Sequence, residues 1–192
     1  MTKKLTSQEG QILLKTARQA IENHLNGEVK PPINLDDYPS SLTKKGACFV
    51  TLTMHGVLRG CIGSIEASQP LINDVQERAV GAAFNDPRFP ELKLDEYPDL
   101  KIEVSRLTPP EKLHYTTHDD LVNKLRPGID GVILRQNFRR ATFLPQVWEG
   151  LPDPEQFLGR LCMKMGLDPA AWRDQHLDVE IYQAEKFIEK II

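Results

Sequence analysis

Residues 47–65 read ACFVTLTMHGVLRGCIGSI, two strand-forming runs separated by His55-Gly56. Aromatic and β-branched residues favour strands. Glycine adopts positive φ freely and histidine tolerates it better than most residues, so the pair predicts a two-residue β-hairpin turn. In an unbulged hairpin Met54 lies opposite Val57, Leu52 opposite Arg59 and Val50 opposite Cys61. Arg59 and Cys61 would then lie on a sheet face lined by apolar side chains. A bulge at Gly60 would change this register.

The second run contains the motif LRGCIG, Leu58 to Gly63, which combines a cation, a thiol and two glycines. In a regular strand Arg59 and Cys61 point to the same face. An adjacent positive charge favours the thiolate, so this pair is the predicted catalytic centre. Gly60 and Gly63 indicate a bulge or the close approach of a ligand or another backbone segment, and we include them as predicted substrate-binding positions. The alternative for Cys61 is a small buried hydrophobic residue.

Outward from the hairpin, helices and strands alternate irregularly. Thr6 and Glu9 have capping-box spacing and open a helix that ends at Gly27. Further elements are predicted as helices at Pro70–Phe84, capped by Ser68, after Thr117 and after Asp153, and as strands at Leu100–Leu107, Ile129–Arg135, Arg140–Leu144 and Val179–Phe187. About six strands with four or five helices predict an α+β fold, with a largely antiparallel sheet flanked by helices.

Composition limits the class of protein. The 192 residues are 40% hydrophobic and 27% charged with a net charge of -3, as in ordinary globular proteins. This balance argues against non-specific polyanion binding by the whole surface, although it leaves room for a local basic cleft. No run approaches the ~20 apolar residues of a membrane span, and the first residues lack a secretory hydrophobic segment. We therefore expect a cytoplasmic protein with three reduced cysteines, of which Cys48 and Cys162 are core residues.

Other polar residues are candidates for ligand binding. Asp86 and Arg88 lie in a proline-rigid turn after a helix, where they form either a salt bridge or an anion site. Glu103 shares a strand face with Ser105 and could accept a proton, or the two could simply be exposed to solvent on a half-covered sheet. Gln146 could orient a ligand through its amide. No metal site is predicted. Arg135, Arg139 and Arg140 with Phe138 form a basic hairpin turn that could contact nucleic acid or simply be solvated.

The ordered motifs resemble the AMMECR domain family over nearly the whole chain, and residues 5–188 are predicted to form one such domain. The motifs are GACFVTL (Gly46–Leu52), LRGCIG, AAFNDPRFP (Ala82–Pro90), IEVSRLTPPE (Ile102–Glu111), GIDGVIL (Gly128–Leu134) and ATFLPQVWE (Ala141–Glu149). The resemblance implies two lobes, a larger one from both chain ends and a smaller inserted one, with a cleft lined by LRGCIG. It also implies Memo-like and radical-SAM proteins as partners. It leaves the cofactor unknown.

Two functions follow from these residues. In the first, the protein is a cleft enzyme that uses Cys61 as a nucleophile or redox thiol on an anionic substrate, which could be a nucleotide, a nucleic acid or a protein. In the second, the same cleft binds a nucleotide, a nucleic acid or a partner protein without catalysis. Sequence alone leaves both open.

Overall fold

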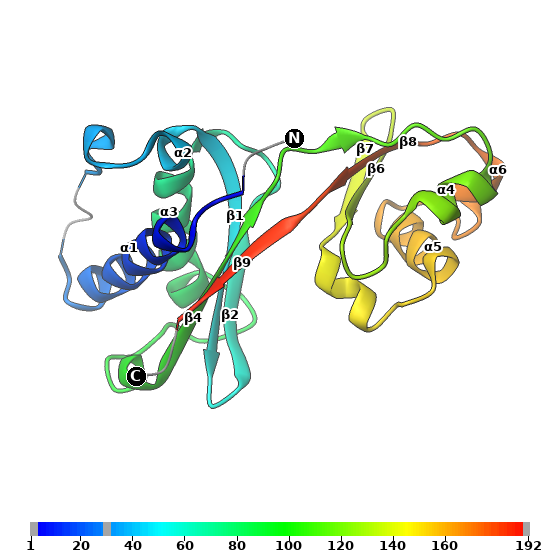
Figure 1. Cartoon of the computed structure of the whole chain (residues 1–192). Coiled ribbons are helices and arrows are strands. Elements are labelled where there is room, and N and C mark those ends of the chain that lie inside the picture. Colours follow the sequence, from blue (N-terminus) through cyan, green and yellow to red (C-terminus); the bar gives the residue numbers. More distant parts are fainter. Residues whose placement is uncertain (1–3, 29–31, 190–192) are drawn as a thin grey trace. The chain divides into compact units, whose positions relative to one another are not determined.

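The computed structural model describes residues 4–28 and 32–189, and the chain divides into two compact units. The first unit runs to Thr108 and resumes at Glu185, and the second comprises Pro109–Ala184. Figure 1 labels most of the helices and strands. The first unit contains α1 (Ser7–Leu25), η1 (Leu35–Asp37), α2 (Ser40–Thr43), β1 (Lys45–Met54), β2 (Val57–Gly63), β3 (Gln69–Pro70), α3 (Leu71–Phe84), η2 (Tyr97–Asp99), β4 (Leu100–Leu107) and β9 (Ala184–Ile188). The second contains β5 (Glu111–Lys112), α4 (His118–Lys124), β6 (Gly131–Gln136), β7 (Arg139–Phe143), η3 (Pro145–Glu149), α5 (Pro154–Lys164), α6 (Ala171–Asp174) and β8 (Asp178–Tyr182).

The first unit is a sheet of order β2-β1-β4-β9, with β3 paired to β1. Strand β1 is antiparallel to β2, β3 and β4. Helices α1 and α3 cover one face (Figure 1), where Val50 and Leu52 of β1 and Ile102 and Val104 of β4 are fully buried. Because strand side chains alternate, Thr51 and Glu103 lie on the other face.

The starts of the two long helices differ in how well they were predicted. Thr6 and Glu9 form the predicted capping box of α1. The prediction that Ser68 caps the next helix is wrong, because α3 begins at Leu71 after Pro70 and has no side-chain cap. The intervening Gln69 and Pro70 are held extended by pairing with β1, which carries the chain past Ser68 before the helix can start.

The hairpin forms with the predicted turn, since His55 and Gly56 have φ values of 51° and 82°. The unbulged register holds for Met54–Val57 and Thr53–Leu58 but is wrong beyond them, because a bulge leaves Arg59 as an extra residue. Cys61 therefore lies opposite Thr51, and Val50 lies opposite Ile62. Gly60, and not Cys61, lies on the helix side with Leu52. Cys61 therefore does not share a face with the apolar side chains that the unbulged register predicted beside it.

The second unit is an antiparallel sheet of order β5-β8-β6-β7 packed against helices. Its core includes Val132 and Leu134 from β6 and Phe157 from α5, with Trp148 stacked on Phe157 at 3.7 Å between ring centroids. Asp153 caps α5, as its sequence predicted.

The single closing strand predicted at Val179–Phe187 is instead two strands. β8 pairs with β6 in the second unit, whereas β9 neighbours β4 in the first. An alternating pattern specifies a strand but not its sheet, which explains the error. Both sheets are nevertheless largely antiparallel and flanked by helices, so the α+β prediction is confirmed. Within the described residues, no helix is both long and apolar enough to cross a membrane.

Candidate functional site

Cys61 lies half-buried on edge strand β2, on the sheet face away from α1 and α3. Its Sγ is 3.3 Å from the Thr51 hydroxyl. The backbone N–H of Cys61 donates to Asp86 at 2.8 Å, and its carbonyl accepts from Arg88 Nη2 at 3.2 Å. The backbone groups that an edge strand leaves unpaired are thus satisfied at Cys61 by two side chains of the segment after α3.

Asp86 and Arg88 form a bidentate ion pair. Arg88 Nε and Nη2 donate to the two carboxylate oxygens at 2.9 and 2.7 Å. The Asp86 side chain is only 2% exposed, whereas that of Arg88 is 54% exposed. The guanidinium and the backbone N–H groups of Cys61 and Arg88 hold the pKa of Asp86 well below its usual range, against the opposing effect of burial. Asp86 therefore stays ionised and fixes Arg88 beside the thiol residue.

Arg59 is engaged elsewhere. Its guanidinium donates to both carboxylate oxygens of Glu96, at 2.8 and 2.9 Å, and to the carbonyls of Pro90 and Glu91. The residue is only 8% exposed. The bulge interrupts the regular alternation on which the predicted pairing of Arg59 with Cys61 rested. The guanidinium that contacts Cys61 is that of Arg88, and Arg59 holds residues 90–96 on the strand.

A row of polar side chains crosses the face of this sheet that lies away from α1 and α3. Cys61 of β2 lies opposite Thr51 of β1, which lies opposite Glu103 of β4. Directly opposed residues share a face with Cβ atoms about 4.5–5.5 Å apart. Glu103 accepts from Ser105 Oγ at 3.2 Å and lies 3.9 Å from Lys186 Nζ. The structure therefore aligns a thiol, a hydroxyl and a carboxylate. Thr51 was missed from sequence because only the bulged register places it beside Cys61.

The motif glycines accommodate contacts within the protein. A Cβ on Gly60 would lie 2.0 Å from the Ala82 carbonyl oxygen of α3. One on Gly63 would lie 2.3 Å from the Phe49 ring. Gln146 lies in η3 of the second unit, and its Oε1 is buried without a hydrogen-bond donor among the described residues.

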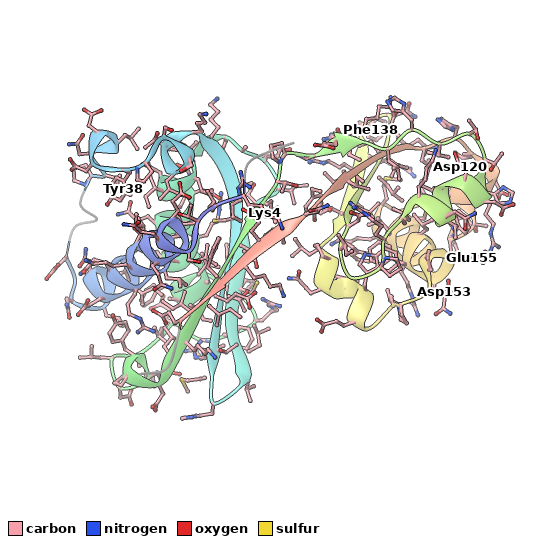
Figure 2. All side chains as sticks on the ribbon, in the orientation of Figure 1. Lys4, Tyr38, Asp120, Phe138, Asp153 and Glu155 are labelled. Atoms are coloured by element: carbon pink, nitrogen blue, oxygen red, sulfur yellow. The ribbon has the colours of Figure 1, made fainter. Side chains whose placement is uncertain are left out.

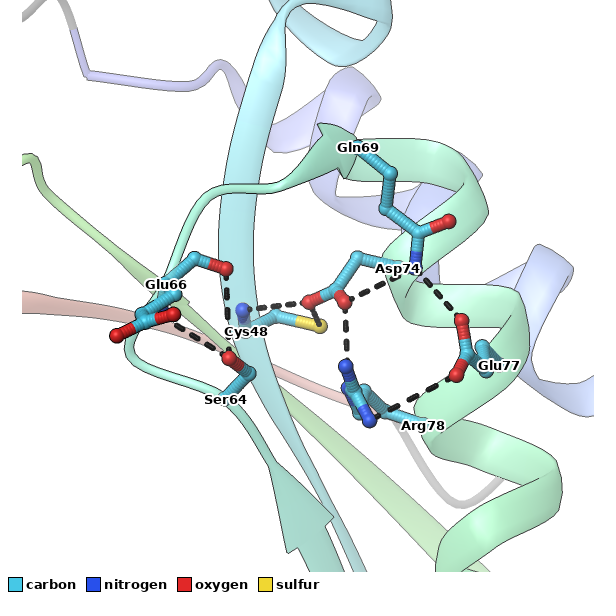
Figure 3. A network of polar contacts seen from close by, with 7 residues as sticks. All are labelled: Cys48, Ser64, Glu66, Gln69, Asp74, Glu77 and Arg78. Carbon is cyan, nitrogen blue, oxygen red and sulfur yellow. Dashed lines mark hydrogen bonds and ion pairs between the residues drawn. The ribbon is translucent and has the colours of Figure 1, made fainter.

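The other cysteines are core residues, as expected. Cys48 is fully buried on the helix side, where its N–H and thiol donate to Asp74 at 3.0 and 3.3 Å. Figure 3 shows this carboxylate also contacting Gln69 and Arg78. Burial raises the pKa of the Cys48 thiol well above its usual value, and it also raises that of Cys162. All three thiols are free, and only Cys61 is partly accessible.

A groove of about 1530 Å³ lies elsewhere in the first unit, between α1, the hairpin turn and η2. Its lining includes Lys15, Arg18, His55, Tyr97 and Asp99, but neither Cys61 nor Arg88. Arg18 is bound there to Glu189 and the Leu100 carbonyl. Because the charges of both signs are interspersed, the groove does not indicate one class of ligand.

The fold defines the class: an α+β protein whose largely antiparallel sheets are flanked by helices. The family model described as AMMECR1 matches residues 14–187, so the chain belongs to the AMMECR1 family. A protein of Methanothermobacter thermautotrophicus is 43% identical over 96% of both chains. Protein MJ0810 of Methanocaldococcus jannaschii is 38% identical over 96% of this chain and 92% of its own. The crystal structure of the uncharacterised protein PH0010 from Pyrococcus horikoshii superimposes with a TM-score of 0.83 at 37% identity, covering 97% of this chain and 94% of that one.

Proposed function

We propose that the protein is an enzyme in which Cys61 acts as a nucleophile on an anionic substrate. The observation that supports it is the hydrogen bond from Arg88 to the Cys61 carbonyl, since it holds a half-exposed guanidinium beside a half-buried thiol. A guanidinium in this position stabilises a thiolate and can bind a phosphate or carboxylate through forked hydrogen bonds. Arg88 takes the role that the sequence suggested for Arg59.

The polar row gives each side chain a role. We assign Glu103, which lies opposite Thr51 in this row, as the acceptor of the thiol proton, and the sulfur then attacks an electrophilic carbon of the substrate. A new S–C bond forms, and the leaving group departs with the electrons of the broken bond. A nucleophilic role is favoured over a disulfide-forming one, because Cys48 points to the opposite face of the sheet and cannot reach Cys61.

Site-resolved alkylation of the native protein tests this proposal. We expect Cys61 to react faster than Cys48 and Cys162. We also expect its rate with iodoacetate to be raised relative to its rate with neutral iodoacetamide, because Arg88 attracts the anion. Replacing Arg88 by Gln should lower the iodoacetate-to-iodoacetamide rate ratio at Cys61 about fivefold, as expected for losing ~1 kcal/mol of attraction between close, exposed charges. Arg173→Gln, in the second unit, is the matched control and should leave the ratio unchanged.

Glu103→Gln should slow Cys61 alkylation by both reagents and leave their ratio unchanged. The proposal is wrong if Cys61 reacts no faster than the two core cysteines, or if Arg88→Gln and Arg173→Gln give the same ratio.

A second function is favoured by the structural roles of the other motif residues. Arg59, Gly60 and Gly63 all serve contacts within the protein, which leaves Arg88 to bind an anion with no need for chemistry at Cys61. Under this alternative, nucleoside phosphates or inorganic phosphate raise the melting temperature of wild-type protein and Cys61→Ser equally. Arg88→Gln abolishes the effect.

A further inference from the structure

The segment 86–96, which follows α3, is attached to β2 at two places. Cys61 holds its first residues, since the Cys61 N–H donates to Asp86 and the Cys61 carbonyl accepts from Arg88. Arg59 holds its later residues through four hydrogen bonds. The side chains of this segment are drawn with those of the other described residues in Figure 2. Arg88 thus lies between Asp86 and the residues that Arg59 binds.

Arg88 is the third residue of a β-turn that begins at Asp86. The Phe89 N–H donates to the Asp86 carbonyl at 3.1 Å and closes the turn, and Pro87 has the fixed φ that favours its second position. Pro90 follows the turn directly, and its ring restricts the backbone further. The position of Arg88 therefore depends on where Pro90 is held.

Arg59 is better suited to hold this segment than Arg88 is. The Arg59 side chain is only 10% exposed, and it donates to the Pro90 carbonyl at 2.9 Å and to the Glu96 carboxylate at 2.8 and 2.9 Å. The Arg88 side chain is 54% exposed, so water competes for its hydrogen bond of 3.2 Å to the Cys61 carbonyl. Bulges often redirect a side chain, and the bulge in β2 falls at Arg59. The buried guanidinium thus determines where the exposed one lies.

We propose that Arg59 is a positioning residue, which sets the preference of the Cys61 thiol for anionic substrates by holding Arg88 in place. This inference rests on the proposed function, because it requires Arg88 to act on the thiol. Nε, Nη1 and Nη2 of Arg59 all donate to residues 90–96, so Arg59 acts on the thiol through this segment. Without Arg59 the turn is free to move on β2. The attraction that Arg88 exerts at the thiol then weakens, because it falls with distance and with hydration.

The ratio of iodoacetate to iodoacetamide alkylation rates at Cys61 tests the proposal on the full chain. Arg59→Met keeps the apolar stem of the side chain and removes its guanidinium. It should lower the ratio about two- to fivefold, the upper value being the loss expected without Arg88. The double variant Arg59→Met with Arg88→Gln should have the same ratio as Arg88→Gln alone, because Arg59 acts through Arg88. If Arg59→Met does not fold, Glu96→Gln, which keeps the size of the side chain and removes its charge, should lower the ratio in its place.

Arg106→Met is the matched control. Arg106 is also a buried arginine of the first unit, 11% exposed and 3.1 Å from Glu185, but it lies opposite Cys48 on the helix side of the sheet. Its replacement should destabilise the protein as Arg59→Met does and leave the ratio at Cys61 unchanged. Amide hydrogen exchange at Cys61 should accelerate in Arg59→Met and not in Arg106→Met, because only the first variant loosens the segment that supplies the acceptor.

The outcomes separate this inference from the proposed function. If Arg88→Gln lowers the ratio while Arg59→Met and Arg106→Met give equal ratios, the positioning role is overturned and the proposed function stands. If Arg88→Gln leaves the ratio unchanged, the proposed function fails and the positioning role fails with it. A ratio in the double variant below that of Arg88→Gln alone would show a direct effect of Arg59 on the thiol, which also overturns the positioning role.

Discussion

Replacing Asp86 by Asn is a stringent perturbation of the Cys61 strand. The carboxylate accepts four hydrogen bonds: Oδ1 from Arg88 N and Nε, and Oδ2 from Cys61 N and Arg88 Nη2. Whichever way an Asn amide is turned, its NH₂ faces two donors. Two bonds to a charged acceptor are lost at ~1.5 to 3 kcal/mol each, and the exposure of Arg88 allows water to recover part of this. We expect a loss of about 3 kcal/mol in the free energy of unfolding, which lowers the melting temperature by roughly 6–12 °C.

Urea denaturation and calorimetry measure this loss, and amide hydrogen exchange localises it. Exchange of the Cys61 amide should accelerate in Asp86→Asn, because that N–H on the edge strand loses its acceptor. The matched control is Asp99→Asn, whose side chain is 58% exposed and lies 3.7 Å from His55, and which should change stability by less than ~0.5 kcal/mol. If both variants have the same stability and the same exchange at Cys61, then Asp86 does not hold the strand.

Two further predictions concern packing and pH. Gly60→Ala should lower the free energy of unfolding by about 1–3 kcal/mol or more, because its Cβ meets backbone of α3 and not a side chain that can move. At Gly150 the nearest atom is 3.9 Å from an added Cβ, so Gly150→Ala should be tolerated. Chemical denaturation compares the two variants. The folded-state pKa of Asp86 is depressed, so its contribution to stability is complete above the unfolded-state value near ~3.9 and is lost as the pH falls toward the folded-state value. The stability difference between wild type and Asp86→Asn should thus be constant above pH ~5 and shrink in acid, and a constant difference down to pH ~2 would contradict this.

Local signals in the sequence predicted most of the fold. β4 spans Leu100–Leu107 as predicted, since the alternating pattern stops at Thr108-Pro109-Pro110. The caps at Thr117 and Asp153 are also as predicted, because they depend on hydrogen bonds within three residues. The hairpin register was not predictable in this way. It depends on the approach of Gly60 to Ala82, a contact between residues far apart in the chain.

The same limit applies to the site. Regular alternation pairs Arg59 with Cys61, and only the bulged register shows Thr51 and Glu103 in line with the thiol. The sequence did single out Arg88, but not its contact with the Cys61 carbonyl. That contact depends on how the segment after α3 folds back onto the edge strand. Glu96, the partner of Arg59, carries no sequence signal that distinguishes it from other surface acids.

The division of the closing segment between two sheets affects how the protein is made. Residues 109–184 are contiguous, so the second unit has all its strands once they leave the ribosome. The first unit begins earlier but needs β9, from the far end of the chain, to flank β4. During synthesis the N-terminal part of the first unit therefore lacks one strand until β9 is made, whereas the second unit can fold as soon as its own residues are available. The edge of β4 is the surface that a ribosome-bound chaperone would need to protect in that interval.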